Sequence, residues 1–304
     1  MTKTSSIKAE FIRRFIALFV AILIAASLTS CQKTPAGEDK NPLWKVSSDK
    51  GSIYLLGSVH ILKHSDYPLS STIDEALYSS DTVVFELDFA EASREESKAL
   101  LNEYSTFSDE RTLRQSLSGN TYSELKGFLG KRGMRVEDAD RMKPWYVANI
   151  LTVEELSDLG FKPDYGVDLH LYTKSLAMGK DIQALETLEY QLGLFNSMSM
   201  EDQDAFVRQT ISELSTINKE FPEIVKAWKS GNTQGLLKLL ESCNDFRETC
   251  RKIIDRRNMD WMPKIEALLQ SGRHAMVIAG AAHMVGENGL LNLLMKKGYR
   301  IEQL

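Results

Sequence analysis

Apolar residues form short runs near both ends of the chain, and these runs have the length and composition of β-strands. The runs Leu43–Val46 and Ser52–Leu56 flank the turn sequence SSDKG, which predicts an antiparallel hairpin. A third run, Thr82–Asp88, is rich in β-branched and aromatic residues, as buried strands are. Two further runs, HAMVIAG (His274–Gly280) and YRIEQL (Tyr299–Leu304), predict strands at the carboxyl end.

Helical periodicity fills the chain between these strands. Ile73 and Leu77 lie four residues apart before the third strand, so strand, helix and strand predict a βαβ unit with a parallel strand pair. Amphipathic helices extend from Glu91 to Lys174, the short strand Gly179–Glu186 interrupts them, and helices then resume. We therefore expect a mixed α/β fold, α+β in character, whose sheet is assembled from both chain ends around a large helical middle.

The amino-terminal segment does not share this pattern. Four basic residues precede the apolar run Phe15–Leu28, and small residues then lead to Cys31, which is the order of a secretory signal peptide over residues 1–30. The tetrapeptide LTSC resembles the lipobox of bacterial lipoproteins, in which the cysteine carries the lipid. Cleavage near Cys31 without lipid attachment and an uncleaved membrane anchor are the alternatives.

A polar stretch joins this segment to the rest of the chain. Residues 31–42 have the composition of a flexible tether, so we expect a single domain, residues 43–304, that is held at a membrane by its lipid. Gln32, directly after the cysteine, favours an exported protein at the outer membrane that faces the periplasm.

Charge narrows the class of partner. Without the four basic residues and one acidic residue of the signal segment, 33 Lys and Arg and 41 Asp and Glu remain, a net charge of about −8. An acidic domain without basic blocks is a poor partner for a phosphate backbone, so we expect no nucleic-acid binding. The sequence does not indicate an oligomeric state.

Two cysteines remain besides Cys31. Cys243 and Cys250 are seven residues apart, and in an exported protein such a pair predicts a local disulfide. A thiol pair or a metal site is the alternative, although no histidine lies near enough in sequence to complete a zinc site.

Polar side chains that could carry chemistry follow four of the predicted strands. His60 and His283 each end a Gly-x-x-His sequence, and Glu86 and Glu186 follow apolar strand residues. Ligands of α/β sheets bind beyond the carboxyl ends of the strands, so these side chains could meet although 223 positions separate the two histidines. Imidazole and carboxylate together could hold a divalent metal or perform acid–base chemistry. A solvated loop histidine is the plainer alternative for each imidazole.

Further residues are candidates for the same site. Asp168 lies two residues before His170, and on a helix the two point about 200° apart, so they would not share one ligand, although Asp168 could still reach a neighbouring site. Any of Arg256, Arg257 and Asn258 could clamp a carboxylate or stabilise an oxyanion. A charged helical surface is the alternative for these three.

Five sequence segments, in this order, resemble the TraB/PrgY/GumN family, which is related to the Tiki proteases and more distantly to erythromycin esterase and ChaN-like proteins. The segments are LWKVSSDKGSIYLLGSVH, TVVFELD, YGVDLHL with GKDIQALETLEYQL, RNMDWMPKI, and VIAGAAHMVGENGLLNLLMKKGYRIEQL. The resemblance covers about Leu43 to Leu304. It implies an α/β fold in which the two Gly-x-x-His histidines and a strand-end glutamate form one site.

Carried onto this sequence, the resemblance implies metal ligands at His60, His283 and Glu86. It assigns Arg257, Asn258, Asp168 and Glu186 to the surrounding catalytic positions. Since Tiki relatives act as metal-dependent peptidases, we expect a hydrolase of a peptide or small-molecule substrate with Mn²⁺, Co²⁺ or Zn²⁺. Glu86 would be the general base if it is not a ligand, and Arg257 would stabilise the oxyanion. The alternative is a surface binding protein that captures haem, a metal or a small peptide.

Overall fold

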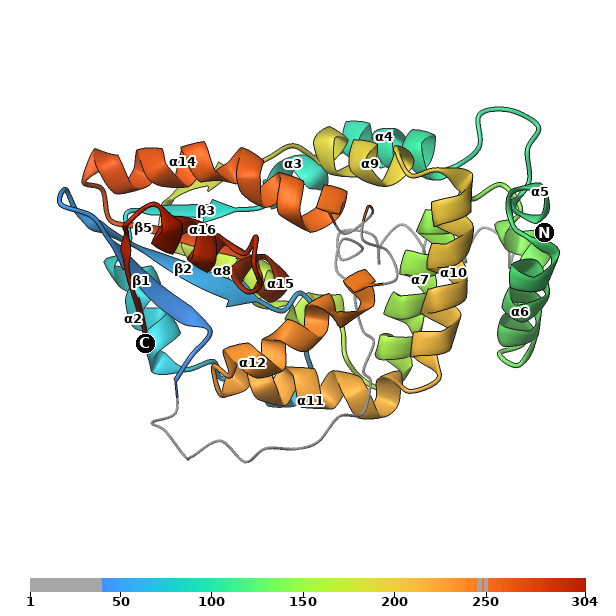
Figure 1. Ribbon diagram of the computed structural model, residues 1–304, viewed down its shortest axis with the longest axis horizontal. Helices are drawn as coiled ribbons and strands as arrows, with labels where there is room; N and C mark the ends of the chain where they lie inside the picture. The colour runs from blue at the N-terminus through green and yellow to red at the C-terminus, as the bar shows by residue number, and fades with distance from the viewer. Residues whose placement is uncertain (1–39, 245–247, 249–250) are drawn as a thin grey trace.

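The computed structural model describes residues 40–244, 248 and 251–304. Six strands form one mixed sheet in the order β4-β3-β5-β2-β1-β6 (Figure 1). Their bounds are β1 Leu43–Ser47, β2 Ser52–Ser58, β3 Thr82–Phe85, β4 Asp181–Ala184, β5 Ala275–Gly280 and β6 Arg300–Gln303. The predicted mixed α/β fold, with its amino-terminal hairpin and its strands from both chain ends, is confirmed.

β5 occupies the centre of the sheet, between β2 and β3. It pairs in parallel with both, and its first residue, Ala275, lies opposite Ile53 of β2 and Thr82 of β3. All six residues of β5 are buried, as expected for a parallel strand covered on both faces. β2 and β3 are therefore parallel, as the βαβ pattern predicts, but they are not neighbours, because β5 from the other chain end separates them.

The antiparallel part of the sheet joins the two chain ends. β1 pairs with β2 in the predicted hairpin and with β6 on its other side. The backbone N–H of Asn41 donates to Leu304, and the carbonyl of Pro42 accepts from Gly57. The sheet therefore already holds the last residues of the predicted tether.

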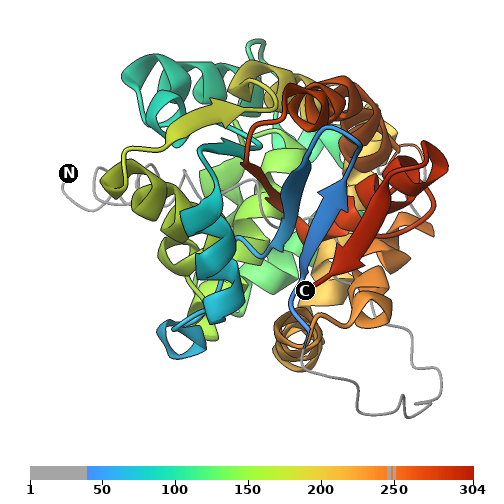
Figure 2. The same ribbon diagram turned by 90° about the vertical axis from the view of Figure 1, so that its left-hand side faces the viewer.

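Helices cover both faces of the sheet, with α2 and α8 on one face and α14 and α16 on the other (Figure 2). The helices of the sheet region are α2 Ser71–Ser79, α3 Phe89–Ala92, α8 Val167–Ala177, α14 Arg257–Ser271, α15 Ala281–Met284 and α16 Leu290–Lys296. Ile73 and Leu77 are buried in α2, as their spacing predicts.

The helical middle extends away from the carboxyl edge of the sheet (Figure 1). Its helices are α4 Glu95–Ser105, α5 Leu113–Ser116, α6 Gly119–Gly130, α7 Pro144–Asp158, α9 Leu188–Asn196, α10 Met200–Leu214, α11 Ile217–Lys229 and α12 Thr233–Leu236. α7 is buried along most of its length and packs against α10. Among the described residues, no helix combines the length and the apolar character that a membrane span requires.

Some predictions fall outside the described part of the chain. These are the signal peptide, the lipid at Cys31, most of the tether, and the Cys243–Cys250 disulfide, because residue 250 and the side chain of residue 243 are not described.

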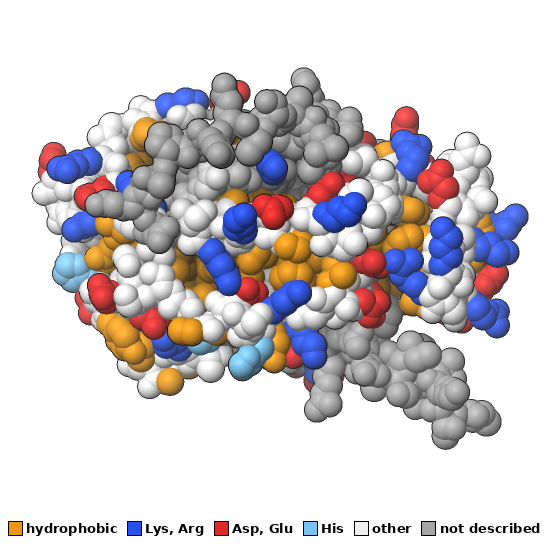
Figure 3. Space-filling view, turned by 90° about the horizontal axis from the view of Figure 1, so that it is seen from below, with side chains coloured by type: hydrophobic (Ala, Val, Ile, Leu, Met, Phe, Trp, Pro, Cys, Tyr) orange, Lys and Arg blue, Asp and Glu red, His pale blue; other side chains and the backbone are white. Residues whose placement is uncertain are grey.

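The face seen from below, over α11 and α12, mixes basic, acidic and apolar side chains without a block of one charge (Figure 3).

Candidate active site

The carboxyl edge of the sheet brings the predicted strand-end residues together. Glu86 follows β3 directly, and Glu186 lies two residues beyond β4. The strand pairing continues past the strands, since the Glu186 N–H donates to the Glu86 carbonyl at 3.0 Å. Glu86 and Glu186 consequently lie at the ends of neighbouring strands, with Glu186 the more buried of the two. His60 follows β2, and His283 lies on α15, directly after β5.

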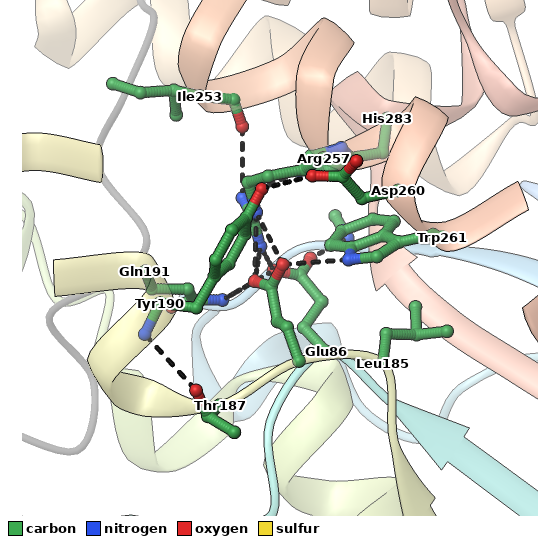
Figure 4. A network of polar contacts seen from close by, with 12 residues as sticks. Glu86, Leu185, Thr187, Tyr190, Gln191, Ile253, Arg257, Asp260, Trp261 and His283 are labelled. Carbon is green, nitrogen blue, oxygen red and sulfur yellow. Dashed lines mark hydrogen bonds and ion pairs between the residues drawn. The ribbon is translucent and has the colours of Figure 1, made fainter. Parts of the chain in front are cut away.

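Arg257, the first residue of α14, lies at the centre of this cluster (Figure 4). Its Nη2 donates to Glu86 Oε2 at 2.5 Å and to Glu186 Oε1 at 2.6 Å. Its Nε donates to Glu186 at 2.9 Å, and its Nη1 contacts the carbonyl of Ile253 at 3.3 Å and Nε2 of His283 at 3.1 Å. A guanidinium has five N–H donors, and all five are engaged here. In this arrangement Arg257 has no donor left for an oxyanion.

Glu186 is the most enclosed carboxylate of the cluster, with a side chain only 4% exposed. Besides Arg257, Trp261 Nε1 donates to its Oε2 at 2.8 Å, and Gln191 Nε2 donates to its Oε1 at 2.5 Å. Burial raises the pKa of Glu186 against the opposing charge of Arg257. Both oxygens nevertheless accept only from N–H donors, which is the environment of an ionised carboxylate.

Asn258 fixes the tautomer of His283. The Asn258 Nδ2 donates to the carbonyls of His283 and Asn288, so its Oδ1 faces the imidazole and accepts from His283 Nδ1 at 2.7 Å. His283 therefore carries its proton on Nδ1 and presents the lone pair of Nε2 to Arg257. Burial, followed by the charge of Arg257, lowers the pKa of His283 to about 3, so this imidazole is neutral at physiological pH.

His60 is held in a similar way from the other side of the cluster. Its Nδ1 lies 3.0 Å from Oδ2 of Asp168 on α8, and its Nε2 lies 3.9 Å from Oε1 of Glu86. Burial lowers the pKa of His60, but the charge and hydrogen bond of Asp168 and the charge of Glu86 outweigh it and raise the pKa to about 9. Within the described residues, Nε2 of His60 makes no hydrogen bond, and this imidazole is 19% exposed.

Gly280 lies beside His60 Nε2 and Glu86 Oε1, the two atoms that face each other across the site. Its N–H donates to Glu86 Oε1 at 2.7 Å, and a Cβ at this position would stand 3.1 Å from His60 Nε2 and 3.5 Å from Glu86 Oε1. Only a glycine leaves this space free. Burial raises the pKa of Glu86, but Arg257, His60 and the Gly280 N–H outweigh it and hold this pKa well below its usual range. Glu86 is therefore an anion turned toward His60.

The donor set fits a divalent ion in its chemistry. Each histidine donates a hydrogen bond from Nδ1 to an oxygen. Nε2 is then the atom that could coordinate an ion, which is the arrangement of metal-binding histidines. His60 Nε2 and Glu86 Oε1 are the two atoms available to such an ion, whereas Nε2 of His283 already accepts from Arg257. Among the described residues, no three His, Cys, Asp or Glu side chains are placed to hold an ion together.

The structure places all seven residues of the predicted site in this cluster and adds two that sequence reasoning missed. Trp261 and Gln191 both bind Glu186, and nothing in the local sequence distinguishes them from core residues. Asp88, two residues after Glu86, lies outside the cluster's hydrogen bonds and accepts from the Ala90 N–H at the start of α3. His170 contacts Tyr67, away from the cluster, as its angle from Asp168 predicts.

Comparisons with known proteins relate the chain to a family and to three distant relatives. The TraB/PrgY/gumN family matches residues 42–303. "Uncharacterized protein YbaP" of Escherichia coli (strain K12) and its namesake of Shigella flexneri are each 21% identical over 243 residues, which is 79% of this chain and 87% of theirs. A "Metalloprotease TIKI homolog" from Amphimedon queenslandica is 21% identical over an alignment of 342 positions, which covers 94% of this chain and 66% of that protein. No solved structure matches the chain.

Proposed function

Because the chain belongs to the TraB/PrgY/gumN family, we propose that it is a hydrolase that cleaves an amide or ester bond of a peptide or small molecule. The observation that carries the proposal is the facing pair of His60 Nε2 and Glu86 Oε1, 3.9 Å apart across Gly280. These two side chains are 19% and 12% exposed, whereas Arg257 and Glu186 behind them are 8% and 4% exposed. The reacting bond would therefore approach from the side of His60.

The protein side of the reaction follows from the charges of this pair. Glu86 is an anionic acceptor that can orient a water molecule; because its pKa is held well below its usual range, it receives the proton only after attack on the carbonyl has made the bound water strongly acidic. His60, as an imidazolium, can donate the Nε2 proton to the leaving nitrogen or oxygen, and Asp168 keeps the ring oriented through Nδ1. After this step Glu86 carries a proton and His60 is neutral, so the proton must pass from Glu86 Oε1 to His60 Nε2, which lies 3.9 Å away, before the next turnover. Arg257 holds Glu86 in place.

A divalent ion is the cofactor that the relative's name suggests. His60 and Glu86 would hold it, and His283 could join only if Arg257 withdrew from its Nε2. Such an ion would supply a water of lowered pKa, a chemistry that zinc hydrolases use at neutral pH. Because His60 must lose its proton to coordinate an ion, ion binding competes with its imidazolium form.

The test is cleavage of a peptide library by purified protein, with and without chelator, followed by readdition of Mn²⁺, Co²⁺ or Zn²⁺. We expect activity that is lost in His60→Ala and retained in the matched control His64→Ala, since His64 packs against Tyr165 outside the cluster. Loss on chelation and recovery with one ion would support the metal. Activity that survives His60→Ala would refute the proposal.

A binding protein is the second candidate, and the engaged donors of Arg257 favour it. With all five N–H groups bound, the cluster offers only His60 as a mobile proton donor, which suits capture of a ligand without turnover. An absorption spectrum in the visible range tests haem, and elemental analysis tests a bound metal.

Under either candidate we propose that the protein works at the cell envelope, lipid-anchored through Cys31 and facing the periplasm. Metabolic labelling with a lipid precursor tests the anchor, since the label should be absent from Cys31→Ala.

A further inference from the structure

Two carboxylates lie side by side at the base of the candidate site, and their mutual repulsion must be balanced. The backbone hydrogen bond from the Glu186 N–H to the Glu86 carbonyl holds the ends of β3 and β4 together at this point. Arg257 Nη2 bridges Glu86 Oε2 and Glu186 Oε1. One guanidinium for two buried anions leaves the group with an excess of negative charge. A second donor to the same oxygens would hold them at a fixed separation.

Gln191 supplies this second donor from α9. Its Nε2 lies 2.5 Å from Glu186 Oε1 and 3.4 Å from Glu86 Oε2, the same two oxygens that Arg257 Nη2 bridges. Thr187 begins the helix by accepting from the Tyr190 N–H, and Gln191 follows in the first turns of α9 with its amide turned toward Arg257 (Figure 4). Gln191 itself is 2% exposed. The two oxygens are thus joined twice, once by a cation and once by an amide.

The orientation of the Gln191 amide is set by the two carboxylate oxygens that it faces. If the Gln191 amide were turned over, its Oε1 would face two carboxylate oxygens, and no proton would lie between them. With Nε2 inward, Oε1 is buried and has no hydrogen-bond partner within the described part of the chain. An unpaired buried acceptor destabilises a fold, so the amide is not explained by packing alone. Its donor function toward the carboxylates explains it.

We propose that Gln191 is a positioning residue of the candidate site, which holds Glu86 and Glu186 against Arg257 so that Glu86 Oε1 stays turned toward His60. The inference rests on the proposed hydrolase function and adds a residue to it. Gln191 does not touch the reacting atoms. It acts through Glu86, whose other oxygen is the one that faces His60.

The test compares two substitutions of buried glutamines. Gln191→Met keeps the volume of the side chain and removes the amide. Gln203→Met is the matched control, because Gln203 is 0% exposed and binds only the backbone of Trp145 and Met198. We expect Gln191→Met to lower kcat by about 10- to 100-fold, as loss of an outer-shell partner does, with KM unchanged. Gln203→Met should lower thermal stability and leave kcat unchanged. A folded Gln191→Met with the kcat of the wild type would overturn the inference.

A second measurement needs neither substrate nor activity. In side-chain amide NMR spectra of the unaltered protein, the Nε2 protons of Gln191 should exchange slowly with solvent, and their signals should move in Glu86→Ala. Exposed Gln234 on α12 is the internal reference for fast exchange. Gln191 protons that exchange as fast as those of Gln234 would overturn the inference even if the protein folds and hydrolyses substrate. Absence of hydrolysis together with slow exchange would contradict the proposed function alone.

Discussion

Nη1 of Arg257 lies 3.1 Å from Nε2 of His283, on the side of the imidazole where a metal ion would bind. The same guanidinium neutralises Glu86 and Glu186. The cluster therefore contains a cation of its own, and the neutral His283 is one of the acceptors that surround this cation. His60, on the opposite side of Gly280, is the histidine that remains open to a ligand.

Removing this internal cation should destabilise the fold. Arg257→Met leaves two buried carboxylates without their counter-charge, and we expect the free energy of unfolding to fall by about 3–5 kcal/mol. The adjacent Arg256→Met is the matched control, because Arg256 is exposed and lies 3.9 Å from Asp260, so its loss should change stability little. Urea denaturation of both variants measures the difference. Equal stability of the two would show that the buried ion cluster is not a source of stability.

The space above Gly280 should be essential to activity. In Gly280→Ala the new methyl group would stand 3.1 Å from His60 Nε2 and block the approach to Glu86. A displacement of about 1 Å at reacting groups can cost about 100-fold in rate, so we expect a loss in kcat/KM of that order. Gly127→Ala on α6 is the control, since nothing lies within 4 Å of its added carbon. Wild-type kcat/KM in a folded Gly280→Ala would exclude His60 and Glu86 as the reacting pair.

The tautomer of His283 should depend on Asn258. Asn258→Leu removes the acceptor for His283 Nδ1 and leaves the carbonyls of His283 and Asn288 without their donor. We expect reduced stability, and the proton of the neutral ring should divide between Nδ1 and Nε2. Nitrogen NMR of the histidine ring reports the tautomer directly. A ring that stays protonated only on Nδ1 in the variant would show that the Arg257 donor at Nε2, and not Asn258, fixes the tautomer.

Stability should depend on pH through His60. Its pKa is raised from 6.5 to about 9 in the folded chain, so the folded state binds the proton more tightly than the unfolded state. This contribution is fully present below pH 6.5 and is lost as the pH rises through about 9. The difference in free energy of unfolding between the wild type and His60→Gln should therefore narrow between pH 6 and pH 10. A difference that is constant over this range would show that Asp168 does not raise the pKa of His60.

The sequence predicted which residues form the site better than it predicted the hydrogen bonds among them. His60, Glu86, Glu186 and His283 were predictable because each follows an apolar strand, and parallel strands end at one edge. Asp168 was a weaker prediction, because its contact with His60 depends on how α8 crosses the sheet. The local pattern offered Arg256, Arg257 and Asn258 together, and only the family resemblance singled out Arg257 and Asn258.

Other features could not be read from the chain because they depend on tertiary packing. Local hydrophobic periodicity places β2, α2 and β3 in order but does not state that β5 enters between the two strands. Gln191 and Trp261 lie on helices whose apolar faces look like any other core surface. Their roles arise only because α9 and α14 meet over Glu186.

The central place of β5 has a consequence for the order of synthesis. His60 and Glu86 are translated long before β5, yet the strands that carry them have no contact surface for each other until residues 275–280 fill the gap. A partly translated or carboxyl-truncated chain would hold the proposed acid and base apart. The proposed hydrolytic activity should thus appear in one step, when the last strands join the sheet. An incomplete chain should not hydrolyse the molecules around it.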